Sequence, residues 1–83
     1  MSTAVRTSGQ LGPILKRLRK EKGWSQQSLG EKVGLSQERI SVIENHPEKV
    51  SLDSLLTVLM ALDVEMQIAP KNTGIRSLPK ERW

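Results

Sequence analysis

Hydrogen-bonding side chains are concentrated in one stretch of the sequence, WSQQSLGEKVGLSQERISVIEN at residues 24–45. It holds three glutamines, four serines and two glycines. Such side chains either cap helix ends, by accepting from free backbone N–H groups, or face a ligand with a regular polar surface, for which DNA is the obvious candidate. The chain shows no nucleophile–base set, paired carboxylates, phosphate-binding glycine loop or metal-ligand spacing, and His46 stands alone. We therefore expect neither an enzyme nor a cofactor.

Length and charge limit the possible classes of protein. A chain of 83 residues without cysteine is one small domain, which needs dense helix packing or a second subunit for stability. The net charge of +4 is uneven: residues 6–22 carry +5 and residues 71–83 carry +3. This balance makes a polyanion a plausible partner. No signal peptide is visible, and the longest apolar-rich stretch, residues 52–60, is too short to cross a bilayer. A cytoplasmic location is expected.

The hydrophobic pattern predicts a helix from about Gln10 to Lys22, after a flexible segment at residues 1–9. Its apolar residues recur at i, i+3, i+4 and i+7. Proline is tolerated in the first turn of a helix, which suits Pro13. Gly23 is expected to end this helix, because glycine readily adopts the left-handed conformation found after helix ends.

Serines mark the starts of the next three helices. Ser25 caps a predicted helix at 26–33 that Gly34 ends, and Ser36 caps a helix at 37–45. Pro47 disfavours helix at the preceding residue, so HPEK is expected to be a loop. Ser51 caps a fourth helix, which we expect to form the centre of the core. Its apolar residues cover more than one face: Leu52, Leu55, Leu56, Leu59, Met60 and Leu62.

The periodicity changes after the helical domain at residues 10–63. In VEMQIAP, at residues 64–70, the apolar residues Val64, Met66 and Ile68 alternate with other side chains, as in a strand with one buried face. A lone strand cannot form a sheet, so this segment either pairs with a second subunit or is extended chain. Residues 71–83 have no periodicity and read as a flexible basic tail.

The two short helices at 26–33 and 37–45 have the spacing of a helix-turn-helix. This motif needs a small residue where its helices cross, a glycine that opens the turn and an apolar residue that follows it. Gly30, Gly34 and Leu35 fit these needs. Ile40 and Ile43 would anchor the second helix from behind. Together these features are fairly specific, although no single one is.

SQQSLGEKVGLSQERISVIEN resembles the helix-turn-helix of phage Cro/repressor-type proteins, the XRE family of DNA-binding domains. The resemblance covers residues 11–62 and implies an all-α, compact, lambda-repressor-like domain of four to five helices. It also implies an ion pair between Arg19 and Glu44. One departure is Gly30, where the family usually has alanine. Glycine within a helix costs roughly 0.5–1 kcal/mol relative to alanine, so the second helix is weakened while the crossing is kept.

The resemblance also implies roles on DNA, because the second helix of the motif enters the major groove. The implied base contacts are Gln37, Glu38, Ser41 and Val42. The implied phosphate contacts are Gln26, Ser36, Arg39, Asn45 and Lys49. Glutamine pairs well with adenine, glutamate accepts from cytosine, and valine suits a thymine methyl group. Arg39 fits either phosphate or guanine, and phosphate is favoured. Helix capping remains the first role of the serines, and Gln27 reads as a solvated residue.

A narrower resemblance is to HipB-type antitoxins of HipA/HipB toxin–antitoxin systems, on GWSQQSLGEKVGLSQERIS, the following strand, the polar tail and the terminal Trp83. It implies a homodimer that pairs residues 64–70 across subunits, with Val64, Met66 and Ile68 buried, and binds a palindromic operator. It further implies that Trp83 contacts a HipA-like kinase toxin and that the protein represses its own operon. The alternatives are a stand-alone XRE regulator without a toxin, or a protein-interaction adaptor that does not bind DNA.

Overall fold

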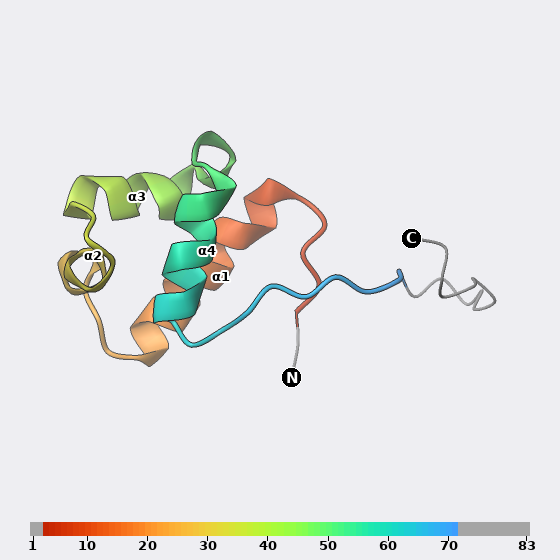
Figure 1. The fold of residues 1–83 in the computed structure, drawn as a ribbon, viewed down its shortest axis with the longest axis horizontal. Coiled ribbons are helices and arrows are strands. Elements are labelled where there is room, and N and C mark those ends of the chain that lie inside the picture. Colours follow the sequence, from red (N-terminus) through yellow and green to blue (C-terminus); the bar gives the residue numbers. More distant parts are fainter. Residues whose placement is uncertain (1–2, 72–83) are drawn as a thin grey trace.

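The structure is a computed structural model that describes residues 3–71. Within this range the chain forms four α-helices and one short 3-10 helix (Figure 1). They are α1 (Ser8–Glu21), α2 (Gln26–Val33), α3 (Gln37–Asn45), η1 (Pro47–Lys49) and α4 (Leu52–Ala61). The predicted all-α architecture is confirmed, and the predicted loop at HPEK contains the 3-10 helix. None of the helices in residues 3–71 has the length and apolar character needed to span a membrane.

The first helix begins earlier than the hydrophobic pattern indicates. The side-chain oxygen of Gln10 accepts the backbone N–H of Thr7 at 2.9 Å, which satisfies a donor that would otherwise be free at the helix start. Helix α1 therefore starts at Ser8 rather than Gln10. Pro13 consequently lies beyond the first turn, and its ring removes the N–H that would bond to the carbonyl of Gly9.

Gly23 caps the C-terminal end of α1, as the sequence predicts. Gly23 has φ +75°, and its N–H donates to Lys20 O at 2.9 Å while the N–H of Trp24 donates to Arg19 O at 3.2 Å. This pair of bonds satisfies carbonyls that the helix leaves free. The same pattern ends α4 without glycine: Asp63 has φ 63°, and the N–H of Val64 donates to Leu59 O at 3.0 Å. The chain thus leaves the domain in a set direction.

The bounds predicted for α2 and α3 are confirmed. The hydroxyls of Ser25 and Ser36 accept from the backbone N–H groups of Ser28 and Arg39, at 3.0 and 3.1 Å. Gly34 ends α2 with φ +75°. Capping depends on residues within one helical turn, which is why the sequence locates these helices so well.

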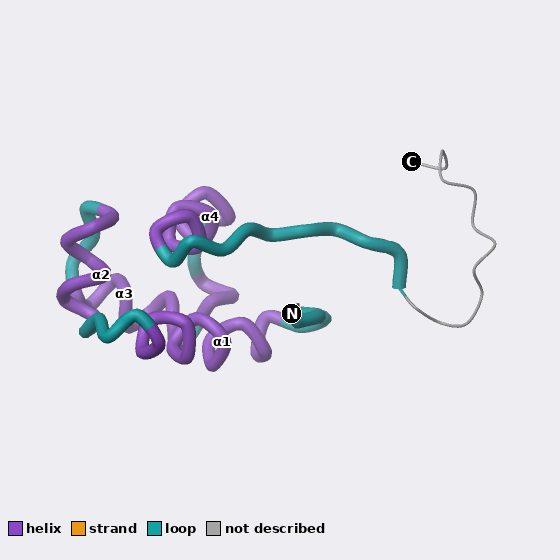
Figure 2. Tube along the Cα trace, turned by 90° about the horizontal axis from the view of Figure 1, so that it is seen from below, coloured by secondary structure: helices purple, strands orange, loops and turns teal. Residues whose placement is uncertain are grey.

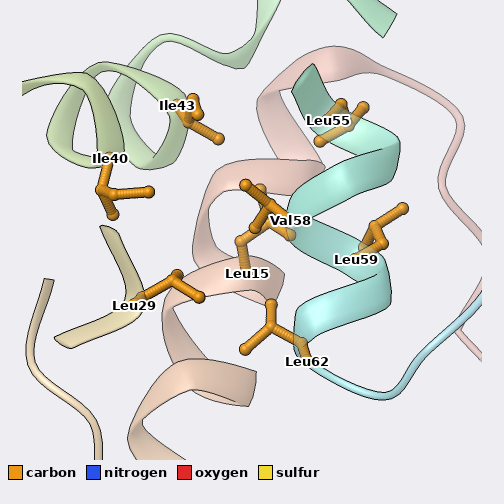
Figure 3. Packing of buried hydrophobic residues seen from close by; sticks show 8 residues of the cluster. All are labelled: Leu15, Leu29, Ile40, Ile43, Leu55, Val58, Leu59 and Leu62. Carbon is orange, nitrogen blue, oxygen red and sulfur yellow. The ribbon is translucent and has the colours of Figure 1, made fainter. Parts of the chain in front are cut away.

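The core lies where α1, α2 and α3 meet the inner face of α4 (Figure 3). Its buried residues are aliphatic: Leu15, Leu29, Ile40, Ile43, Leu55, Val58, Leu59 and Leu62. Trp24 is half-buried against this cluster at the corner between α1 and α2. Aliphatic packing thus determines the orientation of α3.

Helix α4 contributes to the core as predicted, and it also has an apolar stripe that faces outward. Leu52, Leu56 and Met60 are 60%, 37% and 73% exposed. They recur every four residues and therefore share one face. The inner face is filled by Leu55, Val58, Leu59 and Leu62, and residues 3–71 leave the outer stripe exposed.

The predicted strand at residues 64–70 is absent from the part of the chain that the structure describes. Residues 64–71 form no helix or strand and run away from the domain as extended chain (Figure 2). Val64 packs against the core, whereas Met66 and Ile68 are 47% and 88% exposed. A strand needs backbone partners, and none of the described residues supplies them. Trp83 and the rest of the predicted tail beyond Lys71 lie outside the described residues.

Two glycines allow the helices to approach closely. A Cβ atom at Gly12 would meet the backbone carbonyl oxygen of Glu44, and one at Gly30 would meet that of Leu35 and lie 3.4 Å from Ile40 Cγ1. The small residue expected at the α2–α3 crossing is therefore required. The contact at Gly12 was not predicted.

We expect Gly12→Ala to lower the free energy of unfolding by about 1–3 kcal/mol, because the added methyl group must push α1 away from α3. Gly9→Ala is the matched control, since its Cβ would find only Thr7 Oγ1 at 3.9 Å. It should instead stabilise α1, by up to about 1 kcal/mol. Urea unfolding followed by circular dichroism measures both, and equal midpoints for the two variants would contradict the close approach.

Candidate nucleic-acid interface

A buried ion pair ties the third helix to the first. Arg19 Nε and Nη2 donate to the Glu44 carboxylate at 2.6 and 3.1 Å, and both side chains are almost fully buried. Arg19 Nη1 also donates to the carbonyl oxygen of Trp24 at 2.8 Å. The pair expected from the family resemblance is confirmed. Because the guanidinium group holds the carboxylate with two parallel bonds, it fixes the angle as well as the distance between α1 and α3.

The anchoring side of α3 is separate from its polar side. Ile40 and Ile43 have no exposed surface, as the sequence predicts. Gln37 and Glu38, in the first turn of α3, are exposed. Ser41 follows one turn later and is half-buried, as is Val42. Helical spacing puts Gln37, Ser41 and Glu38 on neighbouring positions of one face, so the implied base contacts form a continuous surface.

The implied phosphate contacts have different local roles. The hydroxyl of Ser36 is used as an N-cap, while Arg39 and Lys49 are exposed cations on α3 and η1. Gln26 is half-buried, and its Nε2 donates to Glu44 Oε1 at 3.2 Å. This bond links the start of α2 to the buried ion pair, and sequence analysis did not foresee it. Gln26 is therefore oriented by the same carboxylate that anchors α3.

The side-chain amide of Asn45 also forms hydrogen bonds within the protein. Its Nδ2 donates to the backbone oxygen of Ser41 at 2.9 Å and to Ser41 Oγ at 3.2 Å. Sequence analysis treated the two residues separately, as a phosphate contact and a base contact. Their spacing of four residues, which brings side chains together on a helix, is the signal that connects them.

The site offers little to small molecules. A shallow hollow lies where the start of α1 meets the end of α3, lined by Gly9, Gly12, Pro13, Lys16, Glu44 and Asn45. Residues 3–71 hold no group of three or more histidine, cysteine or acidic side chains that could bind a metal ion. The feature that stands out is instead a short helix with a polar exposed face, carried on a tight turn. Fold and surface together define a helix-turn-helix DNA-binding protein.

Comparisons with known proteins narrow this class. Residues 15–68 match the family described as Helix-turn-helix. The chain is 34% identical over 73 residues to Antitoxin HipB of Escherichia coli K12, covering 87% of this chain and 83% of that protein. It is 36% identical over 59 residues to Antitoxin HipB of Escherichia coli O6:H1 (strain CFT073), covering 71% of this chain and 63% of that protein. The chain belongs to the HipB antitoxin family of helix-turn-helix proteins, which is non-enzymatic.

Solved structures agree with this assignment. One described as a HipA–HipB–O2–O3 complex is similar with a TM-score of 0.78 and 29% identity, covering 83% of this chain and 97% of that chain. Another, described as a HipB–O4 20mer complex, has a TM-score of 0.77 and 29% identity over the same shares. The similarity extends over most of both chains, so it includes the helices that carry the polar surface.

Removing one partner of the buried ion pair should strongly destabilise the domain. Arg19→Met leaves the Glu44 carboxylate buried without its cation, which we expect to cost roughly 3–5 kcal/mol. The control is Arg17→Met, since Arg17 pairs with Glu21 at 3.8 Å with both side chains more than half exposed. That exposed pair should contribute almost nothing. Urea unfolding compares the two, and similar losses would show that the buried pair does not anchor α3.

Proposed function

We propose that this chain is a sequence-specific DNA-binding repressor that acts as the antitoxin of a HipA-like kinase toxin and represses its own operon. The observation that carries the proposal is the division of α3, with Ile40 and Ile43 fully buried and Gln37 and Glu38 exposed. A helix anchored in this way presents a rigid polar edge of the width that a major groove admits. We place the protein in the cytoplasm, where the operon would be.

The polar surface of α3 supports a direct reading of bases. Gln37 offers the paired donor and acceptor that match adenine, and Glu38 accepts from cytosine N4. Val42, on the same helix, suits a thymine methyl group. Ser41 hydrogen-bonds a base edge. These four residues make up the base contacts of the proposed complex.

Phosphate contacts surround this surface. Arg39 on α3 and Lys49 on η1 supply exposed positive charge. Gln26 and Ser36 lie at the starts of α2 and α3, where the helix dipole favours an anion. Since the carboxylate of Glu44 accepts only one N–H of Gln26 Nε2, the second N–H remains to donate to a phosphate oxygen. An Asn45–phosphate contact would require one of its bonds to Ser41 to break.

A homodimer accounts for the apolar surface that the single chain exposes. Leu52, Leu56 and Met60 form an uncovered stripe on α4, and Met66 and Ile68 are exposed on the segment that follows it. Pairing of residues 64–70 with the same residues of a second copy would supply the missing strand partners and bury Val64, Met66 and Ile68. A two-fold dimer would bind a palindromic operator, because each subunit would meet an equivalent half-site.

The antitoxin role rests on the family. The Escherichia coli relatives are HipB antitoxins, and a similar structure contains HipA together with HipB. The proposed toxin contact is Trp83, which lies outside the described residues. Aromatic side chains are preferred anchors in partner pockets.

The first test of the proposal is binding to the promoter upstream of the gene. The protein should bind this DNA more tightly than random duplex, with an affinity that falls steeply with salt because phosphate contacts release counterions. Gln37→Ala should reduce the preference for the promoter by roughly 1–3 kcal/mol. Glu31→Gln, at an exposed position late in α2, should keep it. A wild-type protein that binds both duplexes equally would overturn the operator-binding proposal.

The dimer is tested separately by sedimentation. The wild-type protein should sediment as a dimer, and Met60→Glu should sediment as a monomer that binds the promoter more weakly. The exposed position of Met60 means that a charge there should not disturb the fold of the subunit. Lys16→Glu, at an exposed position of α1, serves as the control and should remain dimeric. A monomeric wild-type protein at high concentration would contradict the dimer.

A further inference from the structure

Asn45, the last residue of α3, holds the side chain of Ser41 one turn earlier. Its Nδ2 donates to the backbone oxygen of Ser41 at 2.9 Å and to the hydroxyl oxygen at 3.2 Å. The amide could not be turned the other way, because its oxygen would then face a backbone carbonyl, which can only accept. The carbonyl therefore decides which end of the Asn45 amide meets the serine hydroxyl.

This arrangement restricts what the hydroxyl of Ser41 can do. A serine hydroxyl has one hydrogen to donate and two lone pairs to accept with. Asn45 occupies one lone pair, so the hydrogen must point elsewhere. Three hydroxyls of the described residues donate to neighbours, Ser25 to Ser28 Oγ, Ser51 to Ser54 Oγ and Thr57 to the carbonyl of Asp53, whereas several others, such as that of Ser36, do not. Among residues 3–71, no acceptor is recorded for the hydroxyl of Ser41.

Ser41 lies on the face of α3 that also carries Gln37 and Glu38. The hydroxyl of Ser41 keeps its hydrogen and one lone pair for a base edge, while Asn45 fixes where the oxygen lies. In the major groove thymine presents O4, guanine presents O6 and N7, and adenine presents N7 as acceptors, whereas cytosine presents the N4–H₂ donor. Because these groups lie at different places along the base edge, an oxygen held in one position reaches some of them better than others.

We propose that Asn45 is a positioning residue that holds the Ser41 hydroxyl in place, and that it thereby sets the base preference at the operator position facing Ser41. The inference rests on the proposed function, because it requires α3 to lie in the major groove. It differs from a phosphate contact by Asn45 in its consequence. Loss of a phosphate contact weakens binding to all sequences alike, whereas loss of a positioning residue changes the preference among bases.

The experiment is a double-mutant cycle read as base preference. Each position of one operator half-site is changed to all four bases, and the wild-type protein is compared with Ser41→Ala, Asn45→Ala and the double variant. In Ser41→Ala the preference among the four bases should fall by roughly three- to tenfold at one position. Asn45→Ala should reduce discrimination at that same position, and should have no further effect when Ser41 is already alanine.

A second variant tests the hydrogen bond without shortening the side chain. Asn45→Asp replaces the amide with a carboxylate, which cannot donate to the carbonyl or hydroxyl oxygen of Ser41. The preference at that position should therefore weaken as it does in Asn45→Ala. Glu31→Gln, at an exposed position of α2, is the control that should leave every preference unchanged. Circular dichroism melting curves establish that each variant is folded.

The possible failures are distinguishable. A wild-type protein without any operator preference would overturn the proposed function itself. Clear wild-type preference, with Asn45→Ala weakening all sequences equally and independently of Ser41, would overturn the positioning role and favour a phosphate contact. A Ser41→Ala variant that changes preference at no position would also overturn the inference, because the serine would then read no base.

Discussion

The buried ion pair between Arg19 and Glu44 is the interaction on which the remaining structure depends. Removing two charges from water is expensive, and the cost is offset only when the geometry is good and the remaining polar atoms are satisfied. Here the guanidinium bonds to both carboxylate oxygens and to the carbonyl of Trp24, and Gln26 donates to the same carboxylate. One pair of side chains thereby connects α1, the start of α2 and α3. A shift of α3 along or around its axis would break several of these bonds together.

Close packing reinforces this arrangement. Gly12 and Gly30 bring the helix backbones so near one another that a methyl group would not fit, and Ile40 and Ile43 close the space behind α3. The result is a short helix that is held firmly on one side and carries unencumbered polar side chains on the other. Rigid support of this kind lowers the entropy lost when side chains order against a partner. Within α3, the hydrogen bonds from Asn45 restrain the side chain of Ser41 in the same way.

The sequence located α2 and α3 correctly because their caps are local: Ser25, Ser36 and Gly34 act on backbone groups within one turn. It placed the start of α1 too late, because the bond from Thr7 N–H to the side chain of Gln10 was not considered. The candidate base-reading residues could be named from the motif. The links from Gln26 to Glu44 and from Asn45 to Ser41 could not, because both residues were considered only as contacts to DNA.

The sequence by itself determined α2 and α3 with their caps, the family and the residues that form the polar face of α3, because these depend on short-range chemistry and on a recognisable motif. Only the tertiary structure decided which apolar residues of α4 are buried. Periodicity gives the apolar positions on a helix, but burial depends on which neighbours pack against them, and Leu52, Leu56 and Met60 stay exposed among residues 3–71. Tertiary structure likewise decided that a glycine is required at Gly12, because the distance between two backbones exists only once the helices have packed.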